Sequence, residues 1–439
     1  MKNAKAMTNK YSSRRKFLRN TLLTTGALGV VPGLSFAESP HIRKFAGEKV
    51  RLGFIGVGRQ AMGLLRNFMQ NPQVEVLAGA DVYEIKRERF AIRTKELYKE
   101  RGQEASVKLY SDYRELLENP EIDAVVIATP DHWHALMAIH ACEAGKDIYL
   151  EKPLTYTVKE GQDLVKAVRD NNIVLAVGSM QRSGANFQHA VRMVQKGYLG
   201  KISTVYAHVG SDPFPKEVDY EGTTIPQGLD WKAWLGPRPE MPYMPELNPP
   251  ITLDPQKNED AWGAWRWYKN TGGGLMTDWG AHMFDIAQWG IGMDRNGPVS
   301  IIPDRGEEPL KFIYSNGIEM LVAPFGEGRQ GVKFIGEKGW ITVSRGQYDS
   351  SVPECQREFS REELGFGGHH VDFIDSVIMR KEPVAPVEVG HSTCTVCTIG
   401  NIAHELGREL SWDPINQKFL NDWEAQTKLH YPYQNGYSI

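Results

Sequence analysis

A short glycine-containing segment is the first part of this chain whose residue types and spacing suggest chemistry. Gly56-Val-Gly58-Arg59-Gln60-Ala61 ends an apolar run from Val50 to Val57 and opens a predicted helix from about Gln60 to Met69. Gly56 permits a tight turn, Gly58 lets the backbone approach a pyrophosphate, and Ala61 allows close helix packing. Arg59 and Gln60 lie at the helix N-terminus, which attracts phosphate. The segment predicts a dinucleotide-binding turn, and a glycine turn without a nucleotide is the alternative.

A carboxylate stands at the end of the next predicted strand. Val74 to Ala80 has the pattern of a buried strand, and Asp81 follows it directly. An acidic side chain at this place hydrogen-bonds the ribose hydroxyls of a dinucleotide and repels a 2′-phosphate. The sequence therefore predicts that the cofactor is NAD rather than NADP.

A second group of ionisable residues lies far along the chain. Asp278, His282 and Asp285 fall within residues 277–289, which we expect to form one helix. Residues four apart share a helix face, so Asp278 and His282 lie side by side, with Asp285 near them. The spacing alone also permits a buried structural Asp–His pair, or a metal site completed by a distant ligand.

Alternating strands and helices must position the glycine turn. Ala124 to Ala128 is a continuous apolar run, which is typical of a parallel strand covered on both faces. Asp147 to Leu150 predicts a further strand, and residues 113–117 and 134–144 predict helices. The pattern indicates an α/β chain that begins with a Rossmann domain, a doubly wound parallel sheet, over residues 48–173.

Residues 174–439 have a different pattern, which predicts a second α/β domain. Lys201 to Gly210, Lys311 to Pro324 and Val332 to Val343 suit antiparallel strands, with turns at Asn316-Gly317 and Lys338-Gly339. Residues 211–270 form an insertion rich in proline and tryptophan. Aromatic faces stack on sugar rings, so this insertion suits the wall of a carbohydrate pocket, although ordinary loop packing is an equal alternative. Trp231 and Arg266 are its candidate substrate contacts.

Several motifs in a fixed order make the chain resemble one known family. Thr129-Pro130 is followed by His134, then come Ala144-Gly145-Lys146 and Glu151-Lys152-Pro153. Gly272-Gly-Gly-Leu-Met-Thr-Asp278-Trp-Gly-Ala-His282-Met-Phe-Asp285 follows later. With the glycine turn, these motifs resemble the glucose–fructose oxidoreductase, inositol dehydrogenase and MocA family over nearly all of residues 38–439. The resemblance implies a Rossmann domain followed by an α/β domain with a large, mostly antiparallel sheet.

The resemblance also assigns roles to residues of this chain. It implies that Lys152 binds substrate and handles a proton beside the nicotinamide. It implies that His282 is an acid/base group and that Asp278 binds and orients the reacting hydroxyl. By the same resemblance, Thr129, Pro130, His134 and Glu151 lie around the cofactor. A surface lysine at a strand end is the alternative for Lys152.

Three functions follow from these assignments. The first is an NAD-dependent oxidoreductase that acts on a secondary hydroxyl of a sugar, cyclitol or glycoside. The second is a hydrolase, lyase or isomerase that oxidises its substrate transiently and returns the same hydride. The third is a carbohydrate-binding protein without activity, which the intact Lys152, Asp278 and His282 disfavour. The same resemblance suggests a homo-oligomer, a dimer or a tetramer.

The N-terminus carries the pattern of an export signal. Ser13-Arg14-Arg15-Lys16-Phe17-Leu18 is a twin-arginine motif, and a weakly apolar run leads to Ser35-Phe36-Ala37, which suits cleavage. We therefore expect residues 1–37 to be a signal peptide and the protein to be periplasmic, with a membrane anchor as the alternative. Without those residues the net charge falls from −3 to −10, because seven Lys and Arg and no acidic residue precede position 38. Such a charge disfavours nucleic acid and anionic membranes as partners.

Two of the four cysteines form a CxxC, at Cys394 and Cys397. In an exported chain this spacing permits a redox pair or half of a metal site. The surrounding residues are small and suit a packed helix, in which both thiols face inward. We favour inward packing, and no metal is expected in this chain.

Overall fold

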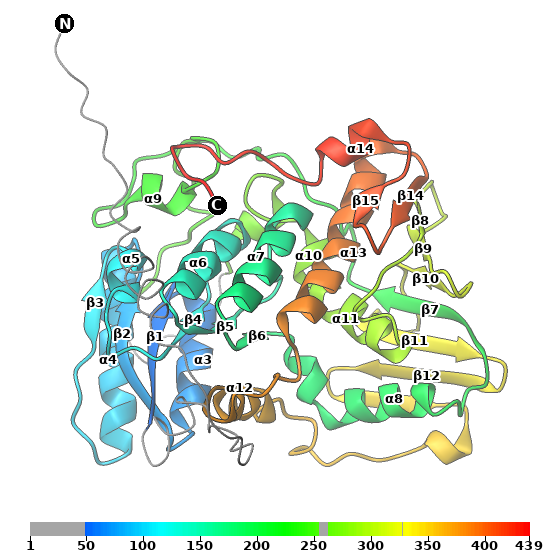
Figure 1. The fold of residues 1–439 in the computed structure, drawn as a ribbon, viewed down its shortest axis with the longest axis horizontal. Helices are drawn as coiled ribbons and strands as arrows, with labels where there is room; N and C mark the ends of the chain where they lie inside the picture. The colour runs from blue at the N-terminus through cyan, green and yellow to red at the C-terminus, as the bar shows by residue number, and fades with distance from the viewer. Residues whose placement is uncertain (1–48, 254–261, 327) are drawn as a thin grey trace, which may run out of the picture.

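Six parallel strands form the first sheet, in the order β3-β2-β1-β4-β5-β6 (Figure 1). This computed structural model describes residues 49–253, 262–326 and 328–439, so the expected signal peptide lies outside the described residues. The strand order is that of a doubly wound dinucleotide-binding sheet, as the sequence predicts. The strands and helices of this domain are β1 (Val50–Ile55), α3 (Arg59–Met69), β2 (Val74–Ala80), α4 (Glu84–Glu100), β3 (Lys108–Tyr110), α5 (Tyr113–Leu117), β4 (Ala124–Ile127), α6 (Asp131–Glu143), β5 (Asp147–Leu150), α7 (Val158–Asp170) and β6 (Leu175–Val177).

Helices cover both faces of this sheet, which explains the continuous apolar runs in its strands. All four residues of β4 are fully buried, and successive residues pack into two separate cores on opposite faces. The sheet also extends past position 173, where the sequence placed the end of the domain. The short run 174–177 follows a turn at Asn172 and adds β6 beside β5.

A nine-stranded sheet dominates the second domain, and all but one of its strand pairs are antiparallel. Its order is β13-β12-β11-β7-β10-β9-β8-β14-β15, and only β7 and β10 run parallel. Helices α8 (Ala185–Gln195), α11 (Gly280–Gly290) and α13 (Val387–Leu406) pack against the sheet around one large apolar core. The elements are α8 (Ala185–Gln195), β7 (Ile202–His208), β8 (Ser300–Ile302), β9 (Lys311–Ile313), β10 (Glu319–Leu321), β11 (Gly331–Gly336), β12 (Gly339–Ser344), β13 (Gln347–Ser350), α12 (Gly368–Met379), α13 (Val387–Leu406), β14 (Leu410–Asp413), β15 (Lys418–Phe419) and α14 (Trp423–Thr427), with short 3-10 helices at Met180–Ser183 and Pro353–Cys355.

The segment expected to form one helix over residues 277–289 is broken at Trp279. Helix α10 (Leu275–Asp278) ends one residue before Trp279, and α11 (Gly280–Gly290) begins one residue after it. The amides of His282 and Met283 both donate to the carbonyl of Trp279, at 3.0 Å each. In a continuous helix the His282 amide would donate to the Asp278 carbonyl. The break therefore frees the Asp278 carbonyl for another donor.

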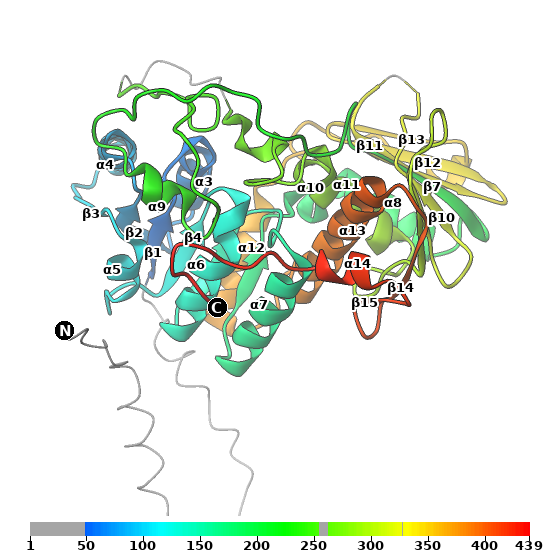
Figure 2. The same ribbon diagram turned by 90° about the horizontal axis from the view of Figure 1, so that it is seen from above.

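The proline- and tryptophan-rich insertion folds over the first domain (Figure 2). It contains α9 (Trp231–Leu235) and a 3-10 helix, Ala264–Trp267, and has a small core of its own that includes Tyr83 of the first domain. Backbone hydrogen bonds join the two parts, from Glu84 N to Gly228 O at 2.9 Å and from Asp230 N to Val82 O at 3.1 Å.

The C-terminal residues return from the second domain to the first and cross over α6 and α7 (Figure 2). The Tyr433 hydroxyl donates to Glu160 of α7 at 2.7 Å. The Asn435 amide donates to the carbonyls of Gly236 and Arg238 in the insertion, at 2.8 and 2.9 Å. Among the helices of the described ranges, none has both the length and the apolarity that a bilayer span requires.

Candidate functional site

A cleft of about 1320 Å³ lies at the carboxyl ends of the first-sheet strands, where the two domains and the insertion meet. In an open parallel sheet this edge is where ligands bind, beside the point at which the strand order reverses. Most of the residues that the sequence assigned to the site line this cleft: Gly56, Gly58, Arg59, Gln60, Asp81, Thr129, Pro130, Glu151, Lys152, Arg266, Asp278 and His282.

The glycine turn has the shape that a pyrophosphate requires. Gly56 has φ +77°, and a Cβ there would lie 2.5 Å from Thr129 Cγ2, so the loops after β1 and β4 meet only because this residue is glycine. At Gly58, no atom of the described residues other than its chain neighbours lies within 4 Å of a Cβ position, so the turn is open toward the cleft. Thr129 Oγ1 is buried in the cleft wall and has no hydrogen-bond partner among the described residues. The turn and this hydroxyl fit a bound dinucleotide phosphate.

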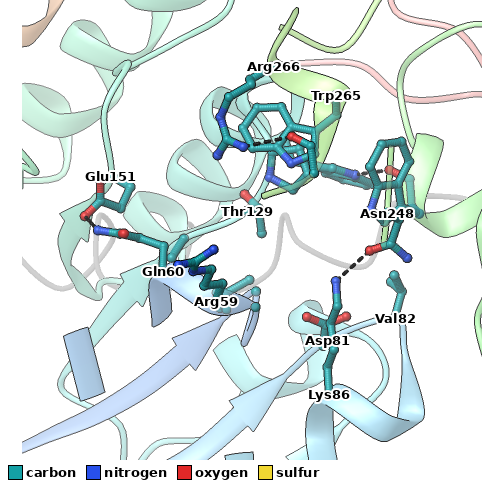
Figure 3. Close-up of a pocket in the computed structure, with 18 of the residues that line it drawn as sticks. Arg59, Gln60, Asp81, Val82, Lys86, Thr129, Glu151, Asn248, Trp265 and Arg266 are labelled. Carbon is teal, nitrogen blue, oxygen red and sulfur yellow. Dashed lines mark hydrogen bonds between the residues drawn. The ribbon is translucent and has the colours of Figure 1, made fainter. Parts of the chain in front are cut away.

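Asp81 is held rigidly at the edge of the cleft (Figure 3). Its two carboxylate oxygens accept from the backbone amides of Val57 and Tyr83, at 3.0 Å each. A carboxylate can accept about four hydrogen bonds, so this side chain retains capacity for the hydroxyls of a ribose.

The insertion closes the same end of the cleft. Lys86 Nζ of α4 donates to Asn248 Oδ1 of the insertion at 2.7 Å (Figure 3). Burial lowers the pKa of Lys86. Neither residue was singled out from the sequence, because the two are 162 positions apart and belong to no motif.

Lys152 and Asp278 form an ion pair at the other end of the cleft. Lys152 Nζ donates to Asp278 Oδ1 at 2.7 Å and to the freed Asp278 carbonyl at 2.9 Å. Burial alone would raise the pKa of Asp278, but the charges of Lys152 and Arg266 and the hydrogen bond from Lys152 lower it overall. Arg266 Nε lies 3.6 Å from the same carboxylate oxygen. The helix break thus gives Lys152 two acceptors and leaves one N–H of an ammonium for a ligand.

His282 lies in the same cleft as a neutral imidazole. Arg345 Nη2 lies 3.0 Å from His282 Nε2, and because arginine only donates, Nε2 must accept and the ring proton is on Nδ1. Burial, followed by the charges of Lys152 and Arg345, lowers the pKa of His282 well below its usual value. His282 cannot take a proton at Nε2 while Arg345 donates to that atom.

Sequence reasoning did not find Arg345. It follows β12 in the turn to β13, 63 positions from His282, and no motif includes it. Its place in the cleft depends on how the second sheet packs against α11, which the sequence pattern does not specify.

Two residues expected around the cofactor lie behind the cleft wall. Ala61 is fully buried in α3, beneath the glycine turn. The ring nitrogens of His134 lie 2.6 Å from the Pro153 carbonyl and 3.0 Å from the Thr129 carbonyl. Burial lowers the pKa of His134 to about 4, so the ring is neutral. Neither side chain lines the cleft. The neutral His134 ring has one N–H, so it donates to one of the two carbonyls and packs between the loops that follow β4 and β5.

Two expected substrate contacts are also placed elsewhere. Trp231 is buried in the insertion's own core, where it stacks on Trp234 with ring centroids 4.5 Å apart. Asp285 is 1 % exposed and accepts from Arg182 Nε at 2.9 Å. Because the residue three positions after His282 turns toward the domain core, Asp285 pairs with Arg182 instead of facing the cleft. Trp262, Trp265 and Trp267 line the cleft in place of Trp231.

The cysteine pair packs inside the protein. Cys394 and Cys397 are unbonded and buried in α13, and burial raises the pKa of both thiols. Cys394 Sγ accepts from the Leu154 amide at 3.0 Å. Within the described ranges, no group of three or more His, Cys, Asp and Glu is arranged to hold a metal ion.

Two sequence models of one oxidoreductase family match the chain. The model of the NAD-binding Rossmann fold matches residues 50–179, and the model of the C-terminal alpha/beta domain matches residues 188–439. The chain belongs to the Gfo/Idh/MocA oxidoreductase family. Its first domain is therefore an NAD-binding domain, which confirms the cofactor expected from Gly56, Gly58 and Asp81.

Curated relatives and solved structures agree with this assignment. The chain is 31% identical over 183 residues to levoglucosan dehydrogenase of Pseudarthrobacter phenanthrenivorans, across 42% of this chain and 36% of that protein. It is 31% identical over 157 residues to an alpha-N-acetylgalactosaminidase of Shewanella oneidensis, across 35% and 34%. Aldose-aldose oxidoreductase of Caulobacter crescentus has the same fold, with a TM-score of 0.56 and 17% identity over 83% of this chain and 100% of that one. The chain spans about half or less of the curated relatives' length.

Proposed function

We propose that the protein is an NAD-dependent oxidoreductase that acts on a secondary hydroxyl of a sugar, cyclitol or glycoside. The observation that carries the proposal is the Lys152–Asp278 ion pair, with N–O 2.7 Å, in the same cleft as the glycine turn. Membership of an oxidoreductase family and similarity to a sugar dehydrogenase support it.

NAD, held by Gly56, Gly58 and Asp81, supplies the hydride acceptor when it is bound. Lys152 Nζ, in its amine form, accepts the proton of the reacting hydroxyl, and Asp278 stabilises the ammonium that results. The freed Asp278 carbonyl holds the same nitrogen, so Lys152 has one direction left in which to meet the substrate. His282 positions the substrate as a neutral group, and its Nε2 becomes a proton acceptor only when Arg345 moves away.

Tryptophans of the insertion give this end of the cleft its carbohydrate-binding character. Trp262, Trp265 and Trp267 line the cleft, and Arg266 lies among them with its guanidinium 4.6 Å from the Trp265 ring. Aromatic rings supply large apolar faces that suit the C–H surfaces of a sugar.

A redox-neutral reaction is the second candidate, and the covered cofactor end favours it. The insertion closes over the nucleotide end through Lys86 and Asn248, which suits a cofactor that stays bound between turnovers. Oxidation at one carbon would acidify the neighbouring C–H, the leaving group would depart, and the same hydride would return. The similarity to an alpha-N-acetylgalactosaminidase supports this candidate.

One experiment separates the two candidates. The purified protein is assayed for bound NAD(H), then incubated with a panel of sugars, cyclitols and glycosides. A keto-sugar formed with stoichiometric or acceptor-dependent NADH supports net oxidation, and a free aglycone without net NADH supports the redox-neutral reaction. Lys152→Ala should lower either rate by roughly 10²–10⁴-fold. Full activity in Lys152→Ala and in His282→Ala would refute the assigned site.

We also propose export through the twin-arginine pathway, with NAD loaded before export and no membrane attachment after processing. Arg14 and Arg15 in the signal pattern support the route, and the covered nucleotide end suits a retained cofactor. Fractionation of producing cells tests the proposal. The NAD-loaded protein should appear in the periplasm, and the double substitution Arg14→Lys, Arg15→Lys should hold it in the cytoplasm.

The assembly we propose is a dimer or a tetramer formed through the second sheet. Helices pack on one face of that sheet, while the other face carries partly buried side chains such as Tyr206, Lys333 and Trp340. Light scattering on the purified protein measures the mass directly, and a monomer at micromolar concentration would contradict the proposal.

A further inference from the structure

Arg345 is a cation in the cleft that forms no ion pair with any described carboxylate. Its Nη2 donates to the neutral His282 ring at 3.0 Å, and within the described ranges its guanidinium makes no ion pair, although the charges of Asp278 and Glu151 act on it from farther away. Arginine carries five N–H donors in a planar fork. Most donors of Arg345 therefore have no acceptor among the described residues.

Aromatic rings fix the plane of this guanidinium. Its central carbon lies 4.7 Å from the centroid of the Trp279 ring and 5.9 Å from that of Phe366. Stacking of this kind orders an arginine side chain and leaves its in-plane donors available. Arg345 is thus oriented before any ligand arrives, which lowers the entropic cost of binding one.

The carboxylates at this end of the cleft are already occupied. Asp278 accepts from Lys152 at 2.7 Å, with Arg266 3.6 Å away. Glu151 accepts from Gln60 Nε2 at 2.9 Å and from the Lys152 amide at 3.2 Å. Three cations, Lys152, Arg266 and Arg345, therefore face two carboxylates that are bound to other donors.

We infer that the carbohydrate on which this site acts carries an anionic group and that this group binds the in-plane donors of Arg345. The inference rests on the proposed function, because it names the substrate class of the same cleft. Arg345 is exposed, so its in-plane donors are open to the cleft, and an anionic ligand supplies acceptors that the described residues do not. The carboxylate of a uronic acid matches the arginine fork with two parallel hydrogen bonds. Sulfate and phosphate esters present similar oxygens and are tested beside it.

Titration calorimetry on the NAD-loaded protein tests the inference without requiring turnover. The ligands are matched pairs: glucuronate with glucose, galacturonate with galactose, and glucose 6-sulfate and 6-phosphate with glucose. At least one anionic sugar should bind roughly tenfold more tightly than its neutral partner, since charge-assisted hydrogen bonds are the strong ones. Equal affinities across all pairs would overturn the inference.

Variants show whether Arg345 carries the preference. Arg345→Gln should weaken the anionic sugar roughly tenfold more than its neutral partner, while Arg345→Lys should keep part of the preference. Arg357→Gln is the matched control, because Arg357 also stacks on an aromatic ring, Phe359, but lies outside the cleft. If Arg345→Gln weakens both sugars equally, Arg345 acts only through His282 and the inference is wrong.

The two proposals fail in different ways. An anionic sugar that binds in an Arg345-dependent manner, yet yields neither reduced cofactor nor a cleaved product, would refute the proposed function and leave the inference standing. Turnover of neutral sugars alone, with no Arg345-dependent binding of an anionic sugar, would refute the inference and leave the proposed function standing.

Discussion

Asp278 contacts Lys152 through two groups, its side-chain carboxylate and its backbone carbonyl. Its carboxylate and its carbonyl both bind Lys152 Nζ, so one residue fixes the position and the charge of the proton-handling group. The sequence predicted that Asp278 and His282 would lie together. It could not predict the second contact, because that contact depends on the break at Trp279.

Asp278→Asn should lower kcat by roughly 10²-fold, because the amide cannot stabilise the ammonium form of Lys152. Initial rates measured at saturating substrate check this effect. Asp163→Asn is the control, because Asp163 pairs with Lys159 on the surface. An unchanged kcat in Asp278→Asn would show that Asp278 does not support proton transfer by Lys152.

Asp131 makes stability depend on pH. Burial raises its pKa to about 8, with the nearby charge of Lys152 opposing that shift. In the unfolded chain an aspartate titrates near 3.9, roughly. Between these values the native state holds a proton that the unfolded chain has released, so stability falls as pH rises and levels off above about pH 8.

Asp131→Asn should reduce this dependence, because the amide has no proton to lose in that range. Denaturant midpoints at pH 5 and pH 8 (roughly the two ends of the window) check the prediction. Asp170→Asn, at an exposed position, is the control. If the wild type and Asp131→Asn lose the same stability between the two pH values, Asp131 does not hold the proton.

At the scale of elements, the sequence predicted the repeating parts well. Apolar runs and glycine positions located β1, β2, β4 and β5 and the helix that follows the glycine turn, because these patterns reflect local burial. Long-range packing decided the rest. The turn that carries Arg345, the face of α11 and the path of the insertion depend on contacts between residues far apart in sequence. Trp231 shows the limit of prediction from residue type, because a tryptophan suits a buried core as well as the wall of a sugar-binding site.

Deletion of residues 432–439 should loosen the hold on NAD. This segment joins α7 to the insertion through Tyr433 and Asn435, and Tyr437 lines the nucleotide end of the cleft against Trp133. Loss of these contacts should speed NAD release by roughly tenfold, equivalent to about 1.4 kcal/mol. Stopped-flow release of NADH measures the rate. Deletion of residues 438–439 alone is the control, and equal release rates in the two deletions would refute a retaining role for the tail.

At the scale of the whole molecule, helix α13 joins the two domains. Val387 and Cys394, near its start, pack in a core of the first domain, while Val396, Ile399 and Ile402 pack in the core of the second. If one domain unfolded alone, α13 would lose its contacts with that domain, and the apolar side chains that made them would become exposed. We therefore expect the two domains to unfold together, although domains of this size commonly unfold separately.

Denaturation followed by two probes tests this expectation. NADH binding reports the first domain, and far-ultraviolet circular dichroism reports both, so the two transitions should coincide. Ile399→Ala removes a fully buried side chain from the second core and should cost about 2–5 kcal/mol. Because the domains are coupled through α13, this substitution should lower the midpoint of NADH loss as much as that of the dichroism. A first domain that still binds NADH after the second has unfolded would show that α13 does not couple them.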